Sequence, residues 1–284
     1  MASKLRIVFL IILAIIFSVP CALSQDCHPG IQQIKERGKL IVAMVNEDYP
    51  PFFMVNKKGE LYGLDVKLGT NIANKLGVEV EFIRKAKTFD EVITMVVRKE
   101  ADVAISKLSK TLKRSEKILF TDPYIILRQG LLVDRLKLAR IQDDEDPIEF
   151  ITHLRGDIGV IASTSYVEFA QHIFPKATIK EFDTWEDVIA ALEKGDILAA
   201  FRDELEIKKI IRAKPHISLD VQTVIFKDTK DSIAMAVSRD NTLFLYWLNE
   251  YLELMNFNLD ADKLLNQYPE IDKTTKANVK RKKP

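Results

Sequence analysis

The sequence of 284 residues lacks an apolar run of the roughly 20 residues that a membrane helix needs. The apolar run Ile7 to Phe17 is much shorter, follows Lys4 and Arg6, and precedes the small residues Ala22 to Ser24. This order is typical of an export signal, and it predicts a signal peptide over residues 1–24, cleaved near Ser24-Gln25. A buried helix is the alternative for the apolar run. We expect the mature chain to be soluble.

Cysteine is also scarce, since the chain has only Cys21 and Cys27 and the first lies in the signal peptide. One remaining cysteine excludes an internal disulfide and a cysteine-rich metal cluster. Neither cysteine follows the Leu-small-small pattern of a lipid-modified bacterial cysteine, so we expect a free periplasmic protein rather than a lipoprotein. The four histidines are scattered and no glycine-rich phosphate loop occurs, so the sequence predicts no metal site and no cofactor.

An excess of positive charge is missing as well. Removal of Lys4 and Arg6 from the 42 lysines and arginines leaves 40, against 41 aspartates and glutamates, and the mature net charge is therefore −1. A nearly neutral chain argues against a general nucleic-acid surface. The 47% hydrophobic content is instead that of an ordinary globular protein.

The mature chain alternates between β-rich runs and amphipathic helical patterns. We expect helices at Ile31 to Arg37, at Leu64 to Leu76 and from Thr88, and strands at Lys39 to Val45, Val78 to Ile83 and Asp102 to Ser106. The third helix starts with a capping box, in which Glu91 stands three residues after Thr88. Strands that alternate with helices predict an α/β fold, whose ligand site lies at the carboxyl ends of the strands.

The same pattern occurs a second time. Phe89 to Ile93 and Trp185 to Ile189 both read aromatic-acid-acid-Val-Ile after a threonine, and the second leads to an apolar strand at Ile197 to Phe201. Two lobes of related build would explain the match, and chance convergence of capped helices is the alternative. The β-rich runs Ile125 to Val133 and Val221 to Phe226 suit two strands that cross between lobes. We expect the first lobe at 28–124, the hinge strands and second lobe at 125–226, and a return to the first lobe at 227–272.

A basic segment, Ile105 to Arg114, interleaves four cations with three hydroxyl side chains. On its own it suits a phosphate, nucleic acid, a carboxylate or only solvent. Lys110, Lys113 and Lys117 are expected at the surface.

In its order of motifs the chain resembles the bacterial extracellular solute-binding proteins of family 3, from about Gly38 to Leu264. The motifs are Gly38-Lys-Leu, Tyr49-Pro-Pro-Phe52, Gly59-Glu-Leu-Tyr-Gly-Leu-Asp65, Ala101-Asp-Val103, Ser109-Lys-Thr-Leu-Lys-Arg114 and Phe120-Thr-Asp-Pro-Tyr124. The resemblance implies the two-lobed type II periplasmic-binding-protein fold with two hinge strands. It also implies a monomer that closes on an amino acid and delivers it to an ABC permease, with no enzymatic activity.

The resemblance assigns the basic segment to the ligand's α-carboxylate, held by Ser109, Thr111 and Arg114. A guanidinium presents a planar fork that fits both carboxylate oxygens. Asp203, on the other lobe, corresponds to the acid that pairs with the α-ammonium. A surface ion network of Asp203 with Arg202 and Glu204 is the alternative.

Several further ligand-binding residues follow from the resemblance. Thr164 and Ser165 stand in the place of the family's glycine-threonine loop, where Ser163 and Ser165 replace glycines and allow the backbone fewer conformations than glycine does. Tyr49 and Phe89 align with the aromatic residues that enclose the ligand's side chain, and core packing is the alternative for both. Ser106 belongs to the same expected site.

Two positions bear on which amino acid binds. Asn46 stands where relatives that bind basic or polar amino acids often have aspartate, which argues against lysine or arginine as the ligand. Lys107 replaces a small residue; if it points into the pocket, an acidic or polar ligand is favoured, and if it points outward the inference fails.

Two other functions share this fold. A periplasmic dehydratase acting on prephenate-like or arogenate-like acids would need a general acid in the cleft, for which Glu47, Asp48 and Glu204 are candidates. A sensory module that presents its ligand-bound form to a receptor would use the same pocket. The tail over 273–284, rich in lysine and threonine, is expected to be disordered and to have no role in the pocket.

Overall fold

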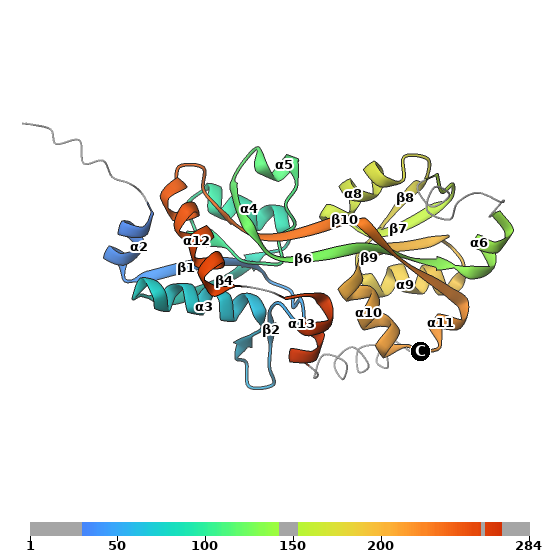
Figure 1. Cartoon of the computed structure of the whole chain (residues 1–284), viewed down its shortest axis with the longest axis horizontal. Coiled ribbons are helices and arrows are strands. Elements are labelled where there is room, and N and C mark those ends of the chain that lie inside the picture. Colours follow the sequence, from blue (N-terminus) through green and yellow to red (C-terminus); the bar gives the residue numbers. More distant parts are fainter. Residues whose placement is uncertain (1–29, 142–152, 257–258, 269–284) are drawn as a thin grey trace, which may run out of the picture.

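Figure 1 shows the computed structural model, in which residues 30–141, 153–256 and 259–268 are described. The expected signal peptide, Cys27 and the expected basic tail lie outside these residues. Within the described ranges, no helix combines the length and apolar character needed to cross a membrane.

One eight-stranded sheet runs through the molecule in the order β4-β1-β5-β10-β6-β9-β7-β8. Its strands are β1 (Lys39–Val45), β4 (Glu79–Ala86), β5 (Val103–Ala104), β6 (Leu119–Asp134), β7 (Asp157–Ile161), β8 (Thr178–Phe182), β9 (Ala199–Asp203) and β10 (Val221–Val237). A separate hairpin consists of β2 (Met54–Val55) and β3 (Leu61–Tyr62). The helices are α2 (Ile31–Arg37), α3 (Leu64–Leu76), α4 (Phe89–Val97), α5 (Leu112–Ser115), α6 (Arg135–Ile141), α8 (Ser165–Ile173), α9 (Trp185–Lys194), α10 (Glu204–Ala213), α11 (Ile217–Asp220), α12 (Thr242–Met255) and α13 (Ala261–Gln267).

The elements form two lobes in line along the long axis (Figure 1). In the first lobe β1 pairs in parallel with β4 and β5, and in the second β7 pairs in parallel with β8 and β9. The first lobe has one buried cluster, whereas the second has one around Phe174 and another around Val188. The expected α/β, two-lobed fold is confirmed.

Threonine caps start the corresponding helices of the two lobes. Thr88 accepts a hydrogen bond from the Glu91 N–H at 3.1 Å, while the Glu91 carboxylate accepts one from the Lys87 N–H at 2.7 Å. Thr184 accepts the Asp187 N–H at 3.2 Å in the same way. The repeated sequence pattern therefore reports equivalent helix starts, at α4 and α9.

Strands β6 and β10 pair antiparallel and pass through both lobes (Figure 1). β10 pairs with β5 in the first lobe through Ala236 and Val237, and β6 pairs with β9 in the second through Gln129 to Val133. Between these regions, 230–233 of β10 pairs with 125–128 of β6. These two short segments are the connection between the lobes.

The first expected crossing strand, Ile125 to Val133, lies within β6. The second, Val221 to Phe226, is only the start of β10, which continues past an irregularity between Ile225 and Lys230 to Val237. The polar run at 227–232 hid this continuation in the sequence.

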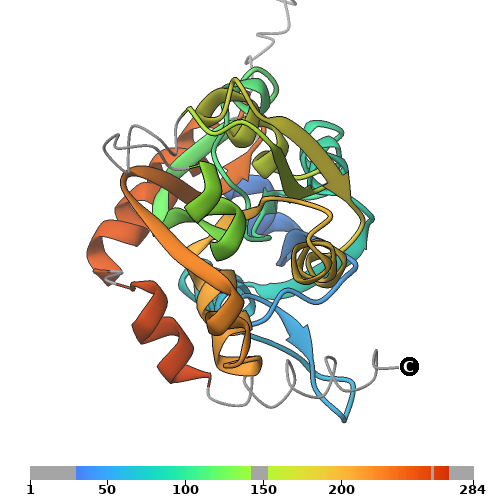
Figure 2. The same cartoon turned by 90° about the vertical axis from the view of Figure 1, so that its right-hand side faces the viewer.

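The lobes also meet away from the strands. Helix α13 lies beside α10 in both views (Figures 1 and 2), and the Lys208 ammonium contacts the Asp262 carboxylate at 2.8 Å. Nearer the cleft, Lys209 of α10 donates to the Pro50 carbonyl of the first lobe at 2.9 Å. The described arrangement is thus a closed one.

Candidate functional site

Two cavities lie between the lobes. The inner cavity, of about 20 Å³, is lined by Phe89, Lys107, Ser109, Arg114, Thr164, Ser165, Tyr166, Arg202, Asp203 and Asp231. The outer cavity, of about 210 Å³, is lined by Glu47, Asp48, Tyr49, Pro50, Ile161, Asp183, Thr184, Trp185, Glu186, Arg202, Glu206, Lys209 and Ile210. Most of these residues follow the carboxyl ends of β1, β5, β7 and β9, where ligand sites of α/β sheets are found.

Arg114 lies in the short helix α5 and is buried. Thr111 starts the helix by accepting the Arg114 N–H at 3.2 Å. The Arg114 guanidinium donates to the Ser109 carbonyl at 3.1 Å and to the exposed Asp90 carboxylate at 3.2 Å, and it lies 5.8 Å from the centre of the Phe89 ring. These contacts fix the guanidinium at the wall of the inner cavity.

The loop that carries Ser109 is held by β10. The Lys110 N–H donates to the Ser232 carbonyl at 2.9 Å, and the Ala234 N–H donates to the Leu108 carbonyl at 3.0 Å. From the opposite lobe, the Ser165 hydroxyl donates to the Ser109 hydroxyl at 2.8 Å. The inner cavity is therefore bounded by hydroxyl groups of both lobes.

Thr164 is the N-cap of α8, accepting the Tyr166 N–H at 3.3 Å and donating to the Ile161 carbonyl at 2.7 Å. The residue before it, Ser163, has φ +58°, in the left-handed region that glycine adopts most easily. The loop keeps this conformation with serine in the place of glycine.

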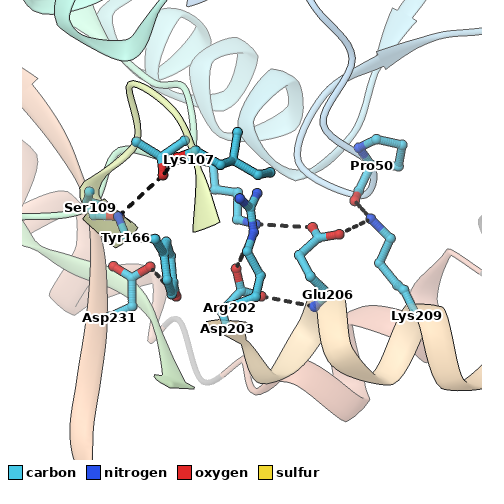
Figure 3. A network of polar contacts seen from close by, with 12 residues as sticks. Pro50, Lys107, Ser109, Tyr166, Arg202, Asp203, Glu206, Lys209 and Asp231 are labelled. Carbon is cyan, nitrogen blue, oxygen red and sulfur yellow. Dashed lines mark hydrogen bonds and ion pairs between the residues drawn. The ribbon is translucent and has the colours of Figure 1, made fainter. Parts of the chain in front are cut away.

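Lys107 points into the cleft, with 5% of its side chain exposed. Its ammonium donates to Asp203 at 3.0 Å and to Glu206 at 3.1 Å, both on the second lobe (Figure 3). Burial lowers the pKa of Lys107, but the two carboxylates outweigh burial, so the pKa is raised and the ammonium stays charged. The Lys107 ammonium thus already pairs with Asp203, the acid that was expected to pair with the ligand's ammonium.

Asp65 holds the backbone at Lys107. Its carboxylate accepts the Lys107 N–H at 2.7 Å and the Tyr124 hydroxyl at 2.8 Å, and Lys107 itself has φ +48°. Burial raises the pKa of Asp65 to about 7, although the two hydrogen bonds oppose the shift. The motif residue Asp65 supports the loop from behind.

Arg202 and Asp203 end β9, and only 4% and 0% of them are exposed. Asp203 caps α10 by accepting the Glu206 N–H at 3.0 Å, and Arg202 Nε lies 3.8 Å from the Asp203 carboxylate. Burial on this scale rules out the alternative of a surface ion network around Asp203. Glu206 bridges Lys107 and Lys209, and although burial raises the pKa of Glu206, these cations lower it further than burial raises it.

Asp231, on β10, is 1% exposed and accepts the Tyr166 hydroxyl at 3.0 Å (Figure 3). Burial, followed by the nearby charge of Asp203, raises the pKa of Asp231 to about 6. A buried carboxyl that titrates in this range holds a proton for part of the time near neutral pH.

The structure brings eight of the ten expected ligand-binding residues to the two cavities. They are Tyr49, Phe89, Lys107, Ser109, Arg114, Thr164, Ser165 and Asp203. Asn46 and Ser106 line neither cavity: Asn46 is exposed, and the buried Ser106 hydroxyl accepts the Val45 N–H at 3.1 Å. Ser106 thus supports the end of β1 instead of facing either cavity.

The lining residues that sequence reasoning missed include the charged and aromatic side chains of Tyr166, Trp185, Arg202, Glu206, Lys209 and Asp231. One signal pointed to Trp185, because it occupies in the second lobe the position that Phe89 occupies in the first. Glu206 and Lys209 stand three residues apart on α10, a spacing that places them on one helix face.

The profile of the bacterial extracellular solute-binding proteins, family 3, matches residues 41–270, which is most of the chain. The protein belongs to this family. Curated relatives include the ABC transporter arginine-binding protein 1 of Escherichia coli K12, 23% identical over 79% of this chain and 88% of the relative. The probable histidine-binding protein of Neisseria gonorrhoeae is 25% identical over 81% of this chain and 83% of the relative.

Solved structures of this family show the same fold. An amino acid ABC transporter substrate-binding protein of Streptococcus pneumoniae bound to L-arginine has a TM-score of 0.65 and 26% identity, covering 85% of this chain and 98% of its own. An ancestral amino acid-binding protein, described as a precursor of cyclohexadienyl dehydratase, has a TM-score of 0.63 and 27% identity, covering 84% of this chain and 98% of its own.

Proposed function

We propose that this family 3 protein captures an amino acid with a polar or acidic side chain between its lobes in the periplasm and delivers it to an ABC permease. The observation that carries the proposal is the placement of Arg114 and Asp203, two buried opposite charges on opposite lobes that line one inner cavity. An α-amino acid carries the complementary pair, a carboxylate for Arg114 and an ammonium for Asp203.

Lys107 is compatible with this assignment because it has two carboxylate partners. When a ligand ammonium approaches Asp203, Lys107 retains its bond to Glu206, which also pairs with Lys209 at 2.8 Å. The buried Lys107 charge remains compensated, and Asp203 becomes available to the ligand. The inward direction of Lys107 meets the condition under which the sequence analysis favours an acidic or polar ligand.

A thermal-shift screen over the twenty common amino acids tests the proposal. A ligand at a hundredfold excess over its dissociation constant stabilises the native protein by about 2.7 kcal/mol, which raises the melting temperature measurably. A response to one or a few polar or acidic amino acids is expected. An unchanged melting temperature with all twenty would contradict amino-acid capture and redirect the search to other carboxylates.

A dehydratase is the second candidate, favoured by one observation. Of the three acids named from the sequence, Asp48 pairs with Arg84 at 2.8 Å, Glu204 pairs with Lys208 at 3.2 Å, and Glu47 is exposed. Asp231, which the sequence analysis did not name, lines the inner cavity, and its pKa is raised to about 6. A carboxyl of that pKa suits a proton donor near neutral pH. Incubation with arogenate and prephenate decides between the two functions, since turnover would replace the carrier assignment.

A further inference from the structure

Arg202 is the one residue, among those lining the two cavities, that lines both. Its side chain therefore lies between the inner cavity, which Arg114 and Asp203 line, and the larger outer cavity. A ligand whose carboxylate and ammonium occupy the inner cavity has to extend its side chain past Arg202 toward the outer one.

The Arg202 guanidinium is buried without full hydrogen bonding. Its side chain is 5% exposed, and Nε and Nη1 have no hydrogen-bond partner among the described residues. The nearest carboxylate oxygen, of Asp203, is 3.8 Å from Nε and is already bonded to Lys107. A buried charged group with free donors is costly unless a partner satisfies it.

Aromatic rings hold the guanidinium in place while leaving its edge available. Its central carbon lies 5.4 Å from the centre of the Tyr166 ring and 5.9 Å from that of the Trp185 ring. Cation–π contacts of this kind use no N–H group, so Nε and Nη1 remain available as donors. A planar carboxylate matches that edge.

The two carboxylates whose charges act most on Arg202, those of Glu206 and Asp203, raise its pKa against burial, but each already bonds a lysine ammonium and neither accepts a hydrogen bond from Nε or Nη1. Lys107 and Lys209 share Glu206, and Lys107 also pairs with Asp203. The outer cavity also carries acids: Asp48 is paired with Arg84, Glu47 and Asp183 are exposed at the rim, and Glu186 is half-buried. Exposed charges are screened by solvent far more than buried ones, so the buried Arg202 is the least screened of these charges where the two cavities meet.

We infer that Arg202 binds a second anionic group, the side-chain carboxylate of the ligand, and that the ligand class is acidic amino acids such as glutamate and aspartate. This inference rests on the proposed capture of an amino acid and narrows it. It opposes arginine or lysine as the ligand, because a cationic side chain would meet the Arg202 charge in a water-poor cleft.

Isothermal titration of the parent protein tests the inference without any variant. Parent protein is titrated with L-glutamate, L-aspartate, L-glutamine, L-asparagine, L-arginine and L-lysine. We expect at least one of the two acids to bind more than tenfold tighter than its amide, and the cationic amino acids to bind more weakly still. Equal binding of acid and amide, or tighter binding of arginine or lysine, overturns the inference while leaving amino-acid capture intact.

The variant Arg202→Gln, with Arg98→Gln as the matched control, tests whether Arg202 causes the preference for the acid over its amide. Arg98 has 70% of its side chain exposed, at the far end of α4 from Phe89. We expect Arg202→Gln to lose more than tenfold in affinity for the acid and little for the amide, and Arg98→Gln to behave as the parent. Circular dichroism confirms folding; should Arg202→Gln not fold, Arg202→Lys, which lacks the planar fork, replaces it with the same expectation of weaker acid binding. A folded variant that keeps the parent's acid preference refutes the role of Arg202.

A dicarboxylate without an amino group separates the two proposals. If the parent binds succinate or 2-oxoglutarate but none of the amino acids, and Arg202→Gln abolishes that binding, amino-acid capture fails and the second anion site at Arg202 stands. If neither amino acids nor dicarboxylates bind, both proposals fall.

Discussion

Lys107 joins the two lobes, and its removal should open the protein. Its ammonium bonds to Asp203 at 3.0 Å and to Glu206 at 3.1 Å, and these three side chains are at most 9% exposed, so solvent screens the contacts little. Removal of one partner of a buried ion pair costs about 3–5 kcal/mol, because an uncompensated charge is left behind.

The lower end of that range applies to Lys107→Met. Glu206 would keep Lys209 at 2.8 Å, and Asp203 would keep the Glu206 N–H at 3.0 Å. A cost of about 3 kcal/mol to the closed form shifts the ratio of closed to open molecules by roughly a hundredfold. Opening the lobes hydrates both carboxylates, and the protein can therefore relieve the cost without unfolding.

Small-angle X-ray scattering of ligand-free protein measures this change. We expect a larger radius of gyration for Lys107→Met than for the parent, and no change for Lys113→Met, which alters an exposed lysine of the neighbouring helix α5. Circular dichroism excludes unfolding as the cause. An unchanged scattering profile for folded Lys107→Met would show that this ion pair does not hold the lobes together.

The remaining predictions concern the ligand contacts, pH and the tail. Arg114→Gln should weaken every amino-acid ligand by about 2–5 kcal/mol in titration calorimetry, whereas Asp203→Asn should weaken amino acids much more than their deaminated analogues; equal losses for both ligand types in the latter would refute the ammonium contact. Burial raises the pKa of Asp65 from 3.8 to about 7, so the folded protein binds an extra proton between these values and the free energy of unfolding should fall as pH rises through this window. Urea titrations from pH 4.5 to about 7.5 should show a weaker fall for Asp65→Asn, and parallel curves would contradict the assignment. Deletion of 273–284 should leave ligand affinity unchanged, and a large loss would contradict the expected absence of a role in the pocket.

The fold was predictable because its signals are local. Strand β1 has the bounds expected from its apolar run, and helix α3 ends at Gly77, whose left-handed conformation closes the helix as the sequence indicates. The threonine caps of α4 and α9 indicated two related lobes. In each of these cases a few adjacent residues carry the physical cause.

The charged interior of the site was not predictable in the same way. The backbone at Lys107 is held by Asp65, which lies 42 residues away and accepts the Lys107 N–H, while the Lys107 ammonium pairs with two carboxylates of the other lobe. The charged neighbours of Arg202 in the sequence suggest that it lies at the surface. It lies instead near the end of strand β9, which is buried between β6 and β7. Such burial of charge is unusual, and only the tertiary arrangement of partners makes it possible.

A crystal structure of the protein with the tightest-binding amino acid of the screen tests the central claim most directly. The account predicts that the ligand lies between the lobes, with its α-carboxylate within hydrogen-bond distance of the Arg114 guanidinium and its ammonium on the Asp203 carboxylate. A ligand bound outside the cleft, or one whose carboxylate and ammonium contact neither residue, would contradict it.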